Sequence, residues 1–316
     1  MNQYASQNPN VELDLPRGEE ADAGLTRQRR RAASRRSELA GIPRPRPAAL
    51  EVRRALASAG AVIGLAALLL GSSQLAFALP TGEQVAAGTA SVSRPNAQTL
   101  QVNQASQKAI LNWSTFSIGA SEAVNFLQPG ASSVALNRVL GNNPSEIFGR
   151  LTATGQIFLV NPNGVLFGRG ASVDVGGIAA TTLGIRDSDF LAGNYVFTNG
   201  GAAGSVVNQG TISAPSGYAA LLGPSVTNEG LIVARLGTVA LAAGDRVALD
   251  MIGDGLISVR VDQAALGAAV INKGTIQADG GNVILTARSA DALLDTVVNN
   301  EGVIRAASLE PVISDV

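Results

Sequence analysis

Short apolar runs separated by Gly, Pro, Asn and Ser fill the chain between residues 79 and 185. The runs lie at Val85, Val92, 100–102, 109–111, 116–118, 124–127 and 133–136. None of them has the 3.6-residue period of an amphipathic helix, and their length is typical of strands. The pattern therefore predicts an all-β domain built from many short strands.

The clearest strand pair in this region is 157–160 and 165–167, two apolar runs joined by a turn. The residues of the turn are Asn161, Pro162, Asn163 and Gly164. Proline fixes φ, asparagine tolerates unusual backbone angles, and glycine has no Cβ to clash, so the four residues favour a tight corner. Because the runs are continuously apolar rather than alternating, we expect strands that are buried on both faces.

Beyond residue 199 the pattern Asn-x-Gly-x-Ile repeats. The repeats begin at Asn208, Asn228, Asn272 and Asn300, at intervals of 20, 44 and 28 residues. A second short strand is expected after most repeats, at 218–222, 238–242 and 282–286. The interval of 44 has room for two turns of 22, with 253–257 in place of the missing asparagine motif. Regular short strands without a leucine ladder favour a parallel β-helix over a leucine-rich repeat.

Each repeat asparagine has an expected role at a corner of the β-helix. Stacked asparagines hydrogen-bond one another along the axis, and we expect the neighbouring glycine to let the backbone turn without strain. At about 21 residues per coil, residues 79–316 would build about ten coils. Five of the eight phenylalanines lie in the first half and predict an internal aromatic stack, namely Phe116, Phe126, Phe148, Phe158 and Phe167.

The segment before residue 79 has a different character. Residues 1–54 are polar, rich in arginine and interrupted by proline, and are expected to be a disordered basic leader. Residues 55–78 read as a signal peptide, because an apolar run of about sixteen residues is followed by Ala76-Phe77-Ala78, a small-x-small cleavage pattern. Cleavage after Ala78 would send the chain to the periplasm. An uncleaved anchor and twin-arginine export are the alternatives.

Charge and composition narrow the function classes. Residues 1–78 carry eleven Lys and Arg against seven Asp and Glu, whereas 79–316 carry twelve against seventeen. The acidic remainder gives no basis for nucleic-acid binding, although the basic leader alone could contact nucleic acid or anionic lipid. The chain has no Cys and no His, so the usual soft metal ligands, thiol nucleophile and imidazole base are missing. We therefore expect no metal, no cofactor and no enzymatic activity.

Residues 79–185 resemble the N-terminal secretion domain of the filamentous haemagglutinin family, the exoproteins of two-partner secretion. The matching segments are Leu79-Pro80-Thr81-Gly82, 106–113, Val124-Asn125-Phe126, 133–139 with Asn137 and Arg138, 156–164, and 168–177. One subgroup of the family has an additional Asn-Pro-Asn-Leu motif. This chain has Asn142-Asn143-Pro144-Ser145 there, which favours the other subgroup and leaves the role of 142–145 in doubt.

The resemblance implies a right-handed parallel β-helix with an N-terminal β cap. It also implies recognition by the periplasmic POTRA domains of a cognate outer-membrane transporter, threading outward unfolded, and an adhesin or haemagglutinin-like role at the cell surface with a host receptor or glycan. The absence of cysteine fits this route, because disulfides formed in the periplasm would block threading. The expected domains are the leader 1–54, the signal peptide 55–78, the secretion domain 79–198 and β-helix repeats at 199–316.

Two questions stay open at the level of sequence. Asn161, Pro162, Asn163 and Gly164, with Asn137 and Arg138, either contact the transporter or only shape the coil that does; burial is expected for Trp113. The alternatives to an adhesin are a polysaccharide-processing enzyme and a purely structural surface protein. The candidate carboxylate pairs for such an enzyme are Asp187 with Asp189 and Asp250 with Asp254, and these are otherwise solvated corner residues.

Overall fold

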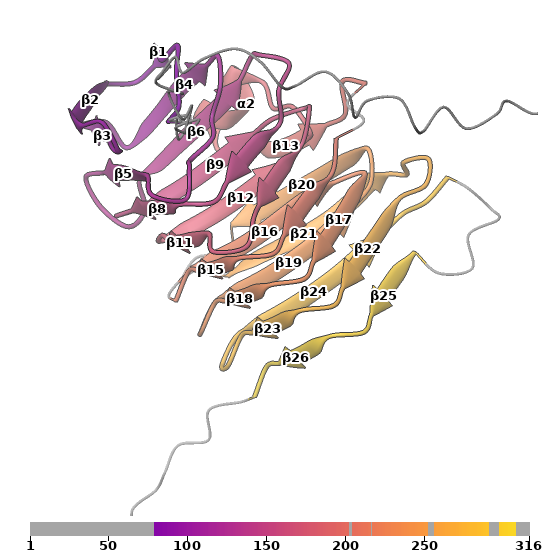
Figure 1. Cartoon of the computed structure of the whole chain (residues 1–316). Helices are drawn as coiled ribbons and strands as arrows, with labels where there is room; N and C mark the ends of the chain where they lie inside the picture. The colour runs from indigo at the N-terminus through magenta and orange to yellow at the C-terminus, as the bar shows by residue number, and fades with distance from the viewer. Residues whose placement is uncertain (1–78, 202–203, 216, 252–255, 291–296, 308–316) are drawn as a thin grey trace, which may run out of the picture. The chain divides into compact units, whose positions relative to one another are not determined.

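Three parallel sheets wind around one apolar interior in a computed structural model that describes residues 79–201, 204–215, 217–251, 256–290 and 297–307. The leader, the signal peptide and its cleavage residues Ala76 and Ala78 lie outside the described residues. The coils from residue 145 to residue 287 each contribute one strand to each sheet, and the coils stack in chain order (Figure 1). The expected parallel β-helix is confirmed.

The strands are assigned to the sheets as follows. Sheet I contains β1 (Gln84–Ala87), β4 (Lys108–Trp113), β6 (Val134–Val139), β9 (Gln156–Val160), β12 (Gly177–Thr181), β16 (Tyr218–Gly223), β19 (Thr238–Ala243) and β24 (Asn282–Ala287). Sheet II contains β2 (Ala90–Asn96), β3 (Thr99–Gln104), β5 (Ala123–Leu127), β8 (Arg150–Ala153), β11 (Ser172–Asp174), β15 (Thr211–Ser213), β18 (Leu231–Val233), β23 (Thr275–Gln277) and β26 (Val303–Arg305). Sheet III contains β7 (Ser145–Ile147), β10 (Val165–Phe167), β14 (Val206–Asn208), β17 (Ser225–Asn228), β22 (Ala269–Asn272) and β25 (Val298–Asn300).

The first coil is closed by a β cap, as the family resemblance implied. β1 pairs antiparallel with β4, and β2 pairs antiparallel with β3, whereas the later strands of these sheets run parallel. The reversed strands cover the backbone edges of the first coil, which would otherwise be exposed as a pairing template. All three sheets continue across residue 198, since β12 pairs with β16, β11 with β15 and β10 with β14.

Two excursions leave the β-helix after strands of sheet I. The first contains α2 (Asp187–Ala192) and β13 (Tyr195–Thr198), and the second is the hairpin of β20 (Arg246–Met251) and β21 (Ile257–Gln263). β20 pairs antiparallel with both β13 and β21, forming a three-stranded outer sheet. The outer sheet and α2 pack against the outside of sheet I (Figure 1).

The position of the outer sheet explains the continuously apolar runs. In β9, Ile157 and Leu159 point into the β-helix, whereas Phe158 and Val160 point into a second apolar cluster beneath the outer sheet. All six residues of β16 and of β19 are buried in the same way. In sheet II, where no second layer follows, β11 alternates between exposed and buried residues. The expectation of strands buried on both faces is confirmed for β9.

Two expectations about the core are wrong. The five phenylalanines do not stack inside the coil, because Phe158 lies in the outer cluster and Phe148 is 36% exposed, while Phe116, Phe126 and Phe167 are interior. The prediction of ten coils also fails. Sheet II has nine strands, one of which is the antiparallel β2, and Asn228 pairs directly with Asn272, so the 44-residue interval is one coil enlarged by the β20–β21 hairpin.

Candidate functional site

The corner between β9 and β10 is fixed by the side chain of Asn161. This residue is fully buried, and its Nδ2 donates to the carbonyl of Asn143 at 3.0 Å and to Oγ of Ser145 at 3.0 Å. Its Oδ1 accepts a hydrogen bond from the backbone N–H of Asn163 at 3.0 Å. Asn161 therefore ties its own turn to the turn of the preceding coil.

The other residues of the corner are exposed to solvent, contact the preceding coil, or do both. Pro162 and Asn163 are exposed, although Nδ2 of Asn163 also donates to the carbonyl of Gly141 at 2.8 Å. Gly164 has a φ of 125°, a backbone angle that residues other than glycine rarely adopt. The backbone of Gly164 accepts from Ser145 in the preceding coil, so the corner is part of the stacking as well as of the surface.

The segment 142–145 lies directly against this corner. Asn143 and Pro144 are exposed like Pro162 and Asn163, so two Asn-Pro turns in successive coils lie side by side. We call the exposed residues Asn142, Asn143, Pro144, Pro162 and Asn163 the turn ridge. The sequence contains a signal for this ridge, namely the recurrence of Asn-Pro at an interval of 18 residues.

Asn137 lies in the interior of the β-helix rather than on its surface. Its Oδ1 accepts the indole N–H of Trp113 at 3.0 Å, and its Nδ2 lies 3.3 Å from the carbonyl of Ala135. Both Asn137 and Trp113 are at most 1% exposed, as was expected for the tryptophan. A buried indole N–H needs an acceptor, and Asn137 provides it.

Arg138, the next residue of β6, points outward and holds the start of the first excursion. Its Nη2 donates to the carbonyl of Ile185 at 2.8 Å and to Oδ1 of Asp187 at 2.6 Å. At the other end of α2, Nζ of Lys108 donates to the carbonyls of Phe190 and Leu191. Desolvation lowers the pKa of Lys108. A cation at helix carbonyls is favourable, so β4 and β6 fix both ends of α2 on sheet I.

The repeat asparagines form a hydrogen-bonded ladder through sheet III. Nδ2 of each residue donates to Oδ1 of the next, from Asn208 to Asn228 at 2.8 Å, from Asn228 to Asn272 at 2.7 Å and from Asn272 to Asn300 at 2.6 Å. The first three are fully buried. This ladder fixes the register of coils separated by 20, 44 and 28 residues.

Glycine is required at the repeat positions for a reason that differs from the one expected. Gly210, Gly230, Gly274 and Gly302 are not among the glycines with positive φ. A Cβ at Gly230 would lie 2.2 Å from the carbonyl oxygen of Gly210, and one at Gly274 would lie 2.1 Å from that of Gly230. These positions require glycine because successive coils approach too closely for a side chain.

A polar groove is lined by residues of the first excursion and of β20. It has a volume of about 770 Å³, and its lining includes Arg186, Asp189, Asn194, Arg246 and Asp250. The structure separates the first candidate carboxylate pair, because Asp187 is bound to Arg138 whereas Asp189 lines the groove. Asp250 lines the same groove, and Asp254 lies outside the described residues.

Within the described ranges, no group of three or more Asp and Glu side chains is arranged to hold a metal ion. The described part of the chain also contains no helix with the length and apolar character of a membrane span.

Comparison with known proteins places this fold in a family. The sequence model described as the TPS secretion domain matches residues 76–311. Two heme/hemopexin-binding proteins of Haemophilus influenzae are similar, one 38% identical over 224 residues and the other 32% identical over 252 residues. The matches cover 68% and 73% of this chain but only 24% and 27% of those proteins, so the chain spans about a quarter of their length.

A solved structure supports the same relationship. The crystal structure of the HMW1 secretion domain from Haemophilus influenzae matches with a TM-score of 0.66 and 32% sequence identity. The match covers 73% of this chain and 60% of that one.

Proposed function

The chain belongs to the TPS secretion domain family, and from this premise we propose that it is an exported, non-enzymatic exoprotein of a two-partner secretion system. The extent of the family match carries the proposal, because residues 76–311 include every strand from β1 to β26. In this proposal residues 1–54 are a leader and residues 55–78 are a signal peptide cleaved after Ala78. The coils that carry the turn ridge form before the transporter binds, and the rest of the β-helix folds outside the cell.

The proposed partner is a cognate outer-membrane transporter that binds the chain through POTRA domains. We assign the contact to the turn ridge rather than to Asn161 or Asn137. Pro162 and Asn163 are exposed, whereas the amides of Asn161 and Asn137 are already used inside the fold. A buried, hydrogen-bonded amide has no free group to offer a partner.

Separate measurements of export and stability test this assignment. Pro162→Ala should leave the free energy of unfolding within about 0.5 kcal/mol of the wild type, as is usual for exposed positions, and should reduce export. Asn161→Ala should cost about 2 to 4 kcal/mol, because it leaves Ser145 and the backbone of Asn163 without their partner. Export of Pro162→Ala at the wild-type level would refute a contact at this residue, and Asn142→Ala would then test the other turn of the ridge.

At the cell surface we propose an adhesin or haemagglutinin-like role, with a host receptor or glycan as the partner of the whole protein. One observation favours the alternative of a polysaccharide-processing enzyme, namely that Asp189 and Asp250 line one groove. Asp250 is exposed, however, and lacks the burial that prepares a carboxyl group to act as a general acid. Release of reducing ends or unsaturated sugars from surface polysaccharides by the purified chain would establish the enzyme and overturn the adhesin.

A further inference from the structure

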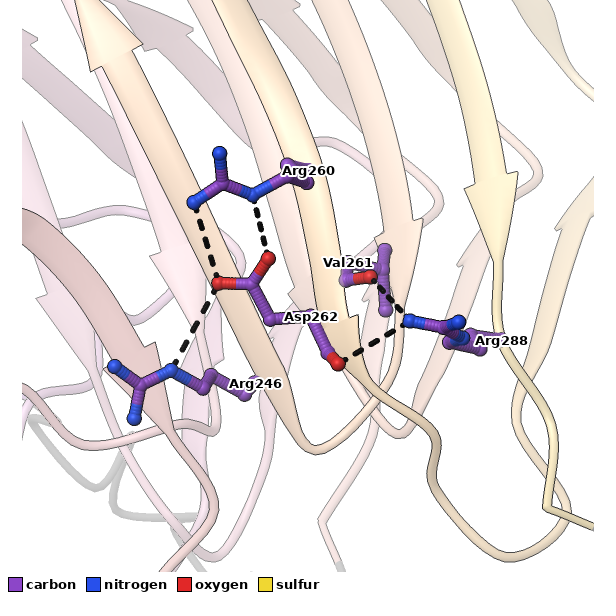
Figure 2. Close-up of polar contacts among 5 residues, drawn as sticks. All are labelled: Arg246, Arg260, Val261, Asp262 and Arg288. Atoms are coloured by element: carbon purple, nitrogen blue, oxygen red, sulfur yellow. Dashed lines mark hydrogen bonds and ion pairs between the residues drawn. The ribbon is translucent and has the colours of Figure 1, made fainter.

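Three arginines from three segments surround Asp262 at the edge of the outer sheet. Arg246 lies at the start of β20, Arg260 lies in β21, and Arg288 follows β24, while Asp262 lies between them (Figure 2). We call these four residues the guanidinium cluster. It is close to the groove, since Arg246 also lines the groove.

The contacts within the cluster hold the arginines in fixed positions. Arg260 donates from Nε to Oδ1 of Asp262 at 2.5 Å, and Nε of Arg246 lies 3.8 Å from the other carboxylate oxygen. Nη1 of Arg288 donates to two backbone carbonyls of β21, that of Val261 at 3.4 Å and that of Asp262 at 3.2 Å. Arg288 therefore has backbone oxygens rather than a carboxylate as its acceptors.

The charges of the cluster do not balance. Hydrogen bonding from Arg260 lowers the pKa of Asp262, so the carboxylate is ionised at neutral pH and the four residues together carry two excess positive charges. This excess is local, because residues 79–316 as a whole carry twelve basic against seventeen acidic residues. Like charges held close together repel one another, and an anionic partner would relieve the repulsion.

The guanidinium groups are also accessible. The side chain of Arg246 is 47% exposed and that of Arg260 is 69% exposed. Arg246 uses only Nε toward Asp262, so both of its Nη atoms point away from the carboxylate (Figure 2). A guanidinium fork of this kind fits a carboxylate with two parallel hydrogen bonds.

We propose that the guanidinium cluster is a docking site for an acidic, extended segment of a partner protein. Several carboxylates in series match several fixed guanidiniums, whereas one small anion at an exposed site gains little over water. The pKa of Arg260 is raised first by Asp262 and to a smaller extent by Asp250, which places the charge of Asp250 within reach of the cluster.

Binding of a fluorescein-labelled octaglutamate peptide to the purified chain, followed by fluorescence anisotropy, tests the proposal. The double variant Arg246→Gln/Arg260→Gln should weaken binding by at least about tenfold, because it removes two charge-assisted contacts. The matched control is Arg169→Gln/Arg235→Gln, which removes two exposed arginines elsewhere and should change binding by less than about twofold. Equal losses in the two double variants would overturn the proposal, since binding would then follow net charge alone.

A variant that is expected to bind the peptide more tightly separates the loss of a contact from the loss of folding. Asp250→Asn removes a negative charge near the cluster and should strengthen octaglutamate binding about two- to threefold. Unchanged binding in this variant would contradict the assigned location. Equal binding of octalysine, displacement by inorganic phosphate at the concentration of the peptide, or tighter binding to phosphatidylglycerol vesicles would each overturn an acidic peptide as the ligand.

Discussion

Buried amide side chains hold this β-helix together at positions where apolar residues would leave buried polar groups unpaired. Asn161 ties one coil to the preceding turn, Asn137 accepts the indole N–H of Trp113, and the repeat asparagines bond one another. Each of these amides is fully buried or in contact with a buried partner. Removing one leaves its partners buried and unsatisfied, which costs more than the hydrogen bond itself contributes.

The asparagine ladder gives the first prediction. Asn228→Ala removes both the acceptor of Asn208 and the donor to Asn272. The free energy of unfolding should fall by about 2 to 5 kcal/mol, because two buried polar groups lose their partner. Urea denaturation measures the change. Asn142→Ala, an exposed asparagine, is the control and should cost less than about 0.5 kcal/mol; equal costs would show that the ladder adds nothing.

Tyr218 makes stability depend on pH in the alkaline range. The residue is 2% exposed and its hydroxyl donates to Oε1 of Gln156 at 2.9 Å. Burial, and to a smaller extent the charge of Tyr195, raises the pKa of Tyr218 well above 10. Below pH 10 the phenol is protonated in both the folded and the unfolded state. Above pH 10 only the unfolded state loses the proton, so rising pH favours unfolding.

Tyr218→Phe should therefore flatten the alkaline loss of stability. At pH 7 the variant should cost about 1 kcal/mol through the lost hydrogen bond. Above pH 10 the wild type should lose up to about 1.4 kcal/mol per pH unit from this group, and the variant should not. Urea midpoints at pH 7, 10 and 11 measure the difference, and an equal alkaline loss in both proteins would show that Tyr218 is not responsible.

The environment of a residue could be predicted from the sequence where the residue type alone decides whether the side chain is buried. Trp113 was expected to be buried, and large aromatic residues usually are. The partner of Trp113 was not predictable, because Asn137 meets it across two coils that are separated by 24 residues. The placement of Phe158 failed for a related reason. In a strand that is apolar on both sides, the sequence pattern does not say which side faces the axis.

At the scale of elements, the outer sheet turns one wall of the β-helix into a doubly covered layer. Phe158 lies at the centre of the apolar cluster beneath the outer sheet. The centroid of its ring lies 5.8 Å from that of Phe190, 4.9 Å from that of Tyr195 and 5.8 Å from that of Phe197. Strands from two separate excursions meet there, since β13 and β20 pair across about fifty residues of sequence. Pairing at such separation carries no local signal, which explains why the outer sheet was not foreseen.

Phe158→Ala tests the outer cluster. The variant should cost about 3 to 5 kcal/mol, as is typical of a buried phenylalanine, and amide exchange in β13 should accelerate while that in β15 and β18 stays slow. Phe148→Ala, at a position that is 36% exposed, should cost at most about 1.5 kcal/mol. Equally accelerated exchange in β15 and β18 would place Phe158 in the interior stack instead.

The same excursions explain why the number of coils was overestimated. The strands expected at 218–222, 238–242 and 282–286 are confirmed as β16, β19 and β24, because the coils that contain them are regular. The interval of 44 residues was divided into two coils, because it has room for two turns of 22 and residues 253–257 stand in place of the missing asparagine motif. Only the direct pairing of Asn228 with Asn272 reveals one enlarged coil.

For the whole molecule, the fold and the family point to one route. The β-helix is capped at its N-terminal end and contains no cysteine. The TPS secretion domain model matches it from residue 76 to residue 311. The turn ridge and the guanidinium cluster would then serve different partners, the transporter before folding is complete and an acidic segment afterwards. The cluster includes Arg288, which follows β24, so it is complete only when that coil has formed.

The most direct test is export of the 316-residue chain in cells with and without the cognate outer-membrane transporter. With the transporter present, the chain should be found outside the cell with Leu79 as its first residue, identified by N-terminal sequencing. Without the transporter, it should remain in the periplasm and be degraded there. Equal release in both strains would contradict two-partner secretion.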